Sequence, residues 1–143
     1  MKRVKRAASS ALVAAALLSG CGGSDKGTDQ EQVTQAVTDF AHAFGKGDGE
    51  KACDQLTPGA RDAFVSRISS LVGTRDCAEA IGKLPAVAGA EVTGPFQTAT
   101  VDQVKVTGDS ATARLTAAGH SAPVRLQKRD GDWLLTAVPG TTQ

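Results

Sequence analysis

Few side chains in this sequence could do chemistry: three cysteines, two histidines and a small number of acids on predicted helices and strands. A thiolate can bond to another sulfur, bind a metal or act as a nucleophile, while imidazole and carboxylate groups can move protons. Cys21 ends an apolar run, whereas Cys53 and Cys77 lie in short helical patterns further along the chain. The first thiol and the other two are therefore expected to have different roles.

Residues 1–20 have the layout of a secretory signal. Four basic residues precede an uncharged run, 7–18, that consists mostly of Ala, Leu and Val. That run of 12 residues is too short for a membrane-spanning helix, which needs about 20. A basic segment followed by a short apolar segment and small residues is typical of a signal peptide, which predicts export.

The four residues Leu18-Ser19-Gly20-Cys21 resemble the lipobox of bacterial lipoproteins. The resemblance implies cleavage after Gly20 and a diacylglyceryl thioether, a palmitate-type anchor, on the Cys21 sulfur. Because two acyl chains hold a protein stably on a bilayer, we expect a lipid-anchored protein on the extracytoplasmic face of the cell membrane, in the cell envelope. Residues 21–28 would form a flexible tether. There are two alternatives to lipidation: residues 1–20 could be an ordinary secretory signal followed by a coincidental cysteine, or they could form a buried N-terminal helix.

Cys53 and Cys77 are the two cysteines that remain if Cys21 is acylated. Because the compartment outside the membrane is oxidising, we expect a disulfide between them. Closing this loop should contribute about 3 kcal/mol, mainly by restricting the unfolded chain. A metal site and a nucleophilic cysteine are weaker alternatives, because no further ligands lie at metal-site spacing and neither histidine is placed as a base. We expect no metal and no cofactor.

The composition argues against nucleic acid as a partner. Without residues 1–20 the chain has 12 basic and 15 acidic side chains, so no basic excess survives. It contains four Phe, one Trp and no Tyr, too few aromatic rings for base-stacking platforms. The remaining 123 residues suit one domain, which we place at residues 29–140.

The first half of that domain reads as helices. Thr28 and Glu31 form a predicted capping box before a helix whose apolar stripe is Val33, Val37, Phe40 and Phe44. Asp48 caps a predicted short helix, and Thr57 followed by Pro58 begins another over 58–72. A last helix is predicted over 75–84, with Thr74 as its cap and Pro85 as its end.

The second half changes to a period of two residues. Residues 86–96 are rich in Gly and Ala and are predicted to be a loop, with at most one short strand. Four alternating segments follow, at 100–107, 110–118, 123–129 and 132–138, separated by turn residues such as Asp130-Gly131. Helices followed by a meander predict an α+β fold, with the N-terminal helices packed on one face of a curved antiparallel sheet of four or more strands.

Four stretches of the sequence belong together. Two lie in the helical half: Phe40-Ala41-His42-Ala43-Phe44-Gly45-Lys46-Gly47-Asp48-Gly49-Glu50-Lys51-Ala52-Cys53 and Leu56-Thr57-Pro58-Gly59-Ala60-Arg61. Two lie in the strand half: Val106-Thr107-Gly108-Asp109-Ser110-Ala111 and Leu126-Gln127-Lys128-Arg129-Asp130-Gly131-Asp132-Trp133. They resemble lipoproteins of actinobacterial type from the nuclear transport factor 2-like superfamily. The resemblance covers residues 30–138 and implies a cone of helices wrapped by a bent sheet, often around a pocket. It says little about activity, since the superfamily includes isomerases, dehydratases and many non-catalytic members.

A catalytic set is hard to find. Asp102 would share the inner face of its strand with Val104 and Val106 if no β-bulge intervenes. His42 lies opposite the apolar stripe of its helix and His120 in a predicted turn, so both are expected to meet solvent. Isomerases of this shape pair an Asp with a Tyr, and the chain has no Tyr.

We therefore expect a non-catalytic binding or accessory domain. Its partner would be a small apolar molecule or an envelope protein, and the membrane would be contacted through the anchor. The candidate pocket-lining residues are Phe40, Phe44, Phe64, Asp102 and Trp133. The alternative function is a small isomerase, lyase or hydrolase that uses an inward-facing Asp102 as its acid or base.

Overall fold

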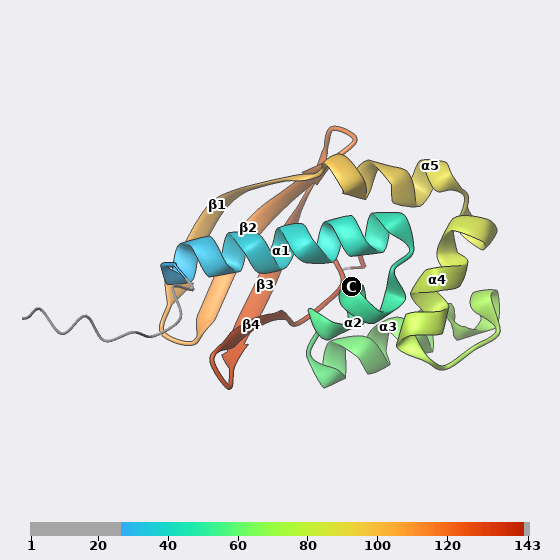
Figure 1. Ribbon diagram of the computed structural model, residues 1–143, viewed down its shortest axis with the longest axis horizontal. Helices are drawn as coiled ribbons and strands as arrows, with labels where there is room; N and C mark the ends of the chain where they lie inside the picture. Colours follow the sequence, from blue (N-terminus) through green and yellow to red (C-terminus); the bar gives the residue numbers. More distant parts are fainter. Residues whose placement is uncertain (1–26, 142–143) are drawn as a thin grey trace, which may run out of the picture.

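The structure is a computed structural model that describes residues 27–141 (Figure 1). The predicted signal segment, Cys21 and most of the predicted tether lie outside the described residues. Helices come first and a four-stranded antiparallel sheet follows, which confirms the predicted α+β class.

Helix α1, Asp29–Lys46, begins at its predicted capping box, but it continues through Gly45, the glycine at which its sequence predicts the end. The Thr28 hydroxyl accepts a hydrogen bond from the Glu31 amide, and the Glu31 carboxylate accepts one from the Thr28 amide. The helix ends at Gly47, whose φ of 72° places it in the left-handed region. The predicted stripe is buried, with Val33, Val37 and Phe40 fully inaccessible to solvent.

Three further helices pack beyond the C-terminal end of α1 (Figure 1). Helix α2 spans Gly49–Asp54 and is capped by Asp48, while α3 spans Pro58–Val72 and is capped by Thr57. Helix α4 spans Cys77–Ala88.

The prediction for α4 was wrong at both ends. Its cap is Asp76, because the Asp76 carboxylate accepts from the Glu79 amide at 2.8 Å, whereas the Thr74 hydroxyl donates to the Glu79 carboxylate instead. The helix also continues through Pro85. The Pro85 ring lies so near the turn after α1 that a Cβ on Gly47 would be 3.2 Å from its Cγ. This close packing offsets part of the cost of a proline inside a helix.

Residues 90–98 are helical, not the predicted loop. Helix α5 spans Ala90–Thr93, and the 3-10 helix η1 spans Gly94–Thr98. Propensity favours a loop here, but Thr93 is almost fully buried and η1 packs against α1. Tertiary packing therefore decides the local structure.

The sheet is a meander in the order β1-β2-β3-β4. Its strands span Thr100–Thr107, Ser110–Ala117, His120–Arg129 and Asp132–Leu135. Strand β3 begins three residues earlier than predicted and contains Pro123. Strand β4 pairs only with Leu126–Arg129, so the β3 edge beside Pro123 has no β4 partner and the missing amide costs no ladder bond there.

Strand β4 is shorter than predicted because the chain turns to the helices. Leu135 forms a parallel bridge with Leu56: its amide donates to the Gln55 carbonyl at 2.8 Å, and its carbonyl accepts from the Thr57 amide at 2.9 Å. These bonds join the end of the sheet to the junction between α2 and α3.

The core lies between α1 and the sheet. Helix α1 crosses one face of the sheet and contacts β1, β2 and β4 (Figure 1). The buried residues alternate along the strands, as a one-sided sheet requires: Ala111, Ala113, Leu115, Val124, Leu126, Trp133 and Leu135. The N-terminal end of α1 lies near the β3–β4 hairpin, while the β2–β3 hairpin is at the opposite end of the sheet.

Candidate functional site

A mostly apolar hollow of about 380 Å³ opens where α5 and η1 meet the β2–β3 hairpin. We call it the apolar hollow. Its walls come from three parts of the chain: Val92, Pro95 and Phe96 from the helical segment, Leu115, Ala117, Ala118 and Ala122 from the strands and hairpin, and Pro139 and Gly140 from the C-terminal segment. Polar side chains in the lining are Glu91, His120 and Ser121.

Val92 is the residue that makes this hollow unusual. Its side chain is 54% exposed, although valine is normally buried. Phe96, half-buried beside it, packs edge-on against Phe44 with ring centroids 5.0 Å apart, so one wall of the hollow is anchored in the core. An exposed apolar side chain next to a rigid apolar wall favours binding of another apolar group.

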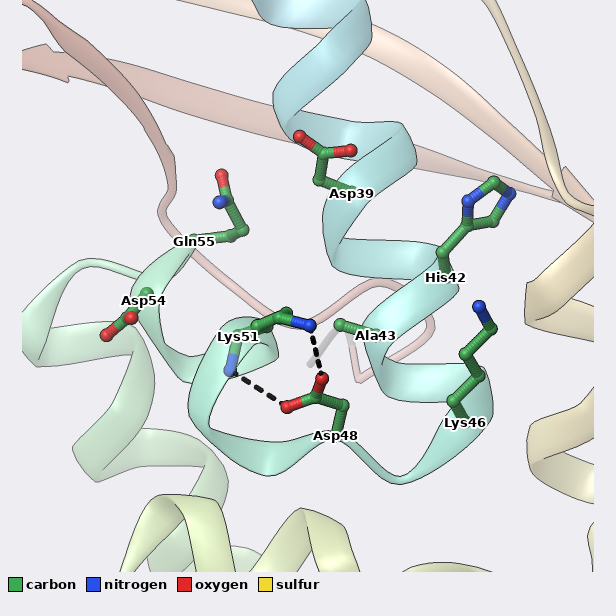
Figure 2. A pocket seen from close by; sticks show the side chains of 8 residues that line it. All are labelled: Asp39, His42, Ala43, Lys46, Asp48, Lys51, Asp54 and Gln55. Atoms are coloured by element: carbon green, nitrogen blue, oxygen red, sulfur yellow. Dashed lines mark hydrogen bonds and ion pairs between the residues drawn. The ribbon is translucent and has the colours of Figure 1, made fainter.

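A second, polar hollow of about 380 Å³ lies between α1 and α2 (Figure 2). Its lining includes Asp39, His42, Lys46, Asp48 and Lys51, which Figure 2 shows around the turn between the helices. Lys51 pairs with Asp48 at 3.1 Å. Hydrogen bonds from the Lys51 side chain and then from its amide hold the pKa of Asp48 below its ordinary value. Asp48 thus caps α2 and pairs with Lys51, so this acid is already occupied within the hollow.

The predicted pocket residues do not line one shared cavity, although Phe44 contacts both Phe40 and Phe64. Phe40 is fully buried and stacks on Phe44, with ring centroids 5.6 Å apart, so both rings fill the core where a cone-shaped pocket was expected. Phe64 is buried but lines a third hollow, beside α3 and β3. The five residues do not converge on one site.

Trp133 lines a groove along α1 and is fixed in place by Asp29. Its indole Nε1 donates to Asp29 Oδ1 at 3.2 Å, and Lys128 Nζ binds the same oxygen at 2.7 Å. The Lys128 hydrogen bond first, and the Trp133 bond second, lower the pKa of Asp29. Lys128 also lies 5.6 Å from the centre of the Trp133 ring. This cluster fastens the start of α1 to β3 and β4, a structural role.

Asp102 is exposed, so the condition for an inward-facing acid is not met. The β1–β2 register shifts between Asp102 and Lys105, and Gln103 there has a φ of 51°. The extra residue places Val101 and Val104, rather than Asp102, on the half-buried inner face. Both histidines are exposed, as predicted.

Cys53 and Cys77 form a disulfide that joins α2 to α4, with Cα atoms 6.2 Å apart. Cys21 lies outside the described residues. Within residues 27–141 no group of three His, Cys, Asp or Glu side chains is arranged to hold a metal ion. In the same part of the chain, no helix is both long and apolar enough to cross a membrane.

Comparison with known proteins gives no relative: no family model, no curated protein and no solved structure matches this chain. The hollows themselves are therefore the features that indicate a function. Sequence reasoning missed Val92, Leu115 and Pro139 as lining residues. The sequence offered only a weak signal for this site: Val92 is an isolated apolar residue between Glu91 and Thr93, three positions before Pro95.

Proposed function

We propose that this protein is a lipid-anchored, extracytoplasmic lipoprotein whose single domain binds a small apolar molecule without catalysis. The observation that supports it best is the apolar hollow, with a largely exposed valine beside a phenylalanine fixed in the core. Apolar walls with a few polar groups at the rim are typical of small-molecule sites. The exposed position of Asp102 gives no support to the alternative enzyme.

The family proposal is a nuclear transport factor 2-like fold with a signal peptide. Its support is the resemblance in sequence together with the α+β order of elements. Buried side chains fill the space between α1 and the sheet. In this proposal the ligand therefore binds at the rim of the cone and not deep inside it.

The proposed anchor would join the domain at a point distant from the apolar hollow. The described chain starts beside the β3–β4 hairpin, where Asp29 binds Lys128, whereas the apolar hollow opens at the β2–β3 hairpin (Figure 1). A chain tethered at Cys21 would therefore join the domain at the end of the sheet away from the hollow, and the attachment itself would leave the hollow uncovered.

Cys21→Ala tests the anchor. Because the thioether needs the Cys21 sulfur, we expect the variant either to leave the membrane fraction or to accumulate as an unprocessed precursor. Fractionation of cells followed by mass spectrometry of the protein measures both. A variant that remains membrane-bound at the mature mass would contradict the lipid assignment.

Val92→Asn tests the apolar hollow. The change replaces an exposed apolar group with an amide, so it should not disturb folding, and we expect the affinity for the neutral dye N-phenyl-1-naphthylamine to fall about fivefold, the equivalent of about 1 kcal/mol of apolar contact. Dye fluorescence during titration measures it.

Val87→Asn is the matched control, because Val87 is 44% exposed on α4 and does not line the apolar hollow. It should leave the dye affinity unchanged. Equal losses in the two variants, or no dye binding to the unmodified protein, would contradict this site.

A further inference from the structure

A third hollow, of about 450 Å³, lies directly beside the apolar hollow and contains two arginines. We call it the arginine hollow. Arg67 projects to it from α3 and Arg125 from β3, and both side chains are exposed. Its apolar walls include Ala63, Phe64 and Val138.

The charge of the arginine hollow is unbalanced. No Asp or Glu lines it, and within residues 27–141 neither guanidinium lies within 4.0 Å of a carboxylate. One nitrogen of Arg67, Nη1, donates to the Thr141 carbonyl, which orients that side chain while leaving its other donors available. Two such groups facing one hollow favour a carboxylate or phosphate, which guanidinium binds in a bidentate manner.

The two hollows share a wall. Pro139 and Gly140 line both of them, and Ala122 of the apolar hollow is adjacent in β3 to Pro123 of the arginine hollow. A molecule that extends across Pro139–Gly140 would therefore meet apolar side chains on one side and two positive charges on the other.

We propose that the ligand is an amphiphile: its apolar chain occupies the apolar hollow, and its anionic head, a carboxylate or phosphate monoester, binds Arg67 and Arg125. This inference rests on the proposed function, since it needs the apolar hollow as the site of the chain. The anionic head group is inferred from its charge complementarity to the two arginines. The apolar chain is inferred from the volume of the apolar hollow and its position beside the arginine hollow.

Calorimetric titration of the full chain carrying Cys21→Ala, so that no lipid anchor competes, tests this directly. The probes are decanoate, decyl phosphate and decanol, each below the concentration at which it aggregates. We expect the better of the two anions to bind at least about tenfold more tightly than decanol, because charge-assisted hydrogen bonds add to the same apolar contact. The comparison of decanoate with decyl phosphate identifies the head group.

Arg67→Gln and Arg125→Gln should each remove most of the preference for the anion and leave decanol binding unchanged. Arg75→Gln is the matched control: it removes the same charge from an exposed site that lines neither hollow, and it should have no effect. Because all three residues are exposed, the variants should fold, which circular dichroism verifies.

Equal affinity of the Cys21→Ala chain, with both arginines present, for decanol and both anions would overturn the amphiphile proposal while leaving the apolar site intact. A preference that survives in both arginine variants would also overturn it. Anion binding that is lost in the arginine variants but unchanged by Val92→Asn would mean that the apolar chain of the ligand binds outside the apolar hollow. That result would overturn both the amphiphile proposal and the apolar site. If none of the three probes bound, both proposals would fail.

Discussion

Replacing Cys53 or Cys77 by serine is expected to lower the free energy of unfolding by about 3 kcal/mol, because the unfolded chain regains the conformational entropy that the closed loop removes. The bond spans 24 positions of the chain and joins α2 to α4, two helices that pack directly against each other. For a domain of this size the loss corresponds to a melting temperature about 12 °C lower. Thermal unfolding followed by circular dichroism measures it.

The double variant Cys53→Ser/Cys77→Ser is the informative control. Because one bond is lost in all three variants, the double variant should be no less stable than either single one. The unmodified protein in a thiol reductant should behave in the same way. Losses that add in the double variant would show that the two sulfurs are not bonded to each other in the protein.

Gly49→Ala is expected to cost about 3 kcal/mol, because no space exists for a methyl group at the start of α2. A Cβ on Gly49 would lie 2.7 Å from the Ala78 Cα and 2.6 Å from its carbonyl carbon, and these are backbone atoms of α4 that no side-chain rotation can move away. The disulfide holds the same two helices together, so they cannot separate to relieve the contact. Urea unfolding measures the loss.

Gly59→Ala is the matched control, since the same substitution in α3 meets no atom within 4 Å. Alanine there should stabilise the protein by up to about 1 kcal/mol through its higher helix propensity. The cost of Gly49→Ala should also shrink in the variant that lacks both disulfide cysteines, because the helices can then move apart. An unchanged free energy of unfolding for Gly49→Ala would contradict the close packing of α2 on α4.

Local signals predicted the first helix well and the segments after it less well. The capping box at Thr28 is formed within α1, and the stripe ending at Phe44 is a regular spacing within one segment, so both can be recognised in the local sequence. The path of the chain through Pro85 and over residues 90–98 depends on packing against Gly47 and α1, which are distant in the sequence. Leu71 illustrates the same limit: it belongs to a predicted apolar stripe but is 58% exposed.

The candidate site was less predictable than the fold for a related reason. A single residue, Gln103, decides which side of β1 carries Asp102. An alternating sequence pattern does not indicate where a non-glycine residue will adopt a positive φ. The apolar hollow combines residues from α5, η1, the β2–β3 hairpin and the segment after β4. Such a site exists only once the chain has folded. Phe40 and Phe44, which the sequence predicted as pocket-lining residues, are buried in the core instead.

Mapping the bound dye by NMR tests the central claim most directly. In a titration of isotopically labelled protein with N-phenyl-1-naphthylamine, the proposed site predicts that the largest amide shift changes cluster at Val92, Leu115 and Ala122. Changes that cluster instead around Asp39 and His42 in the polar hollow, or that are absent at saturating dye, would contradict a binding function for the apolar hollow.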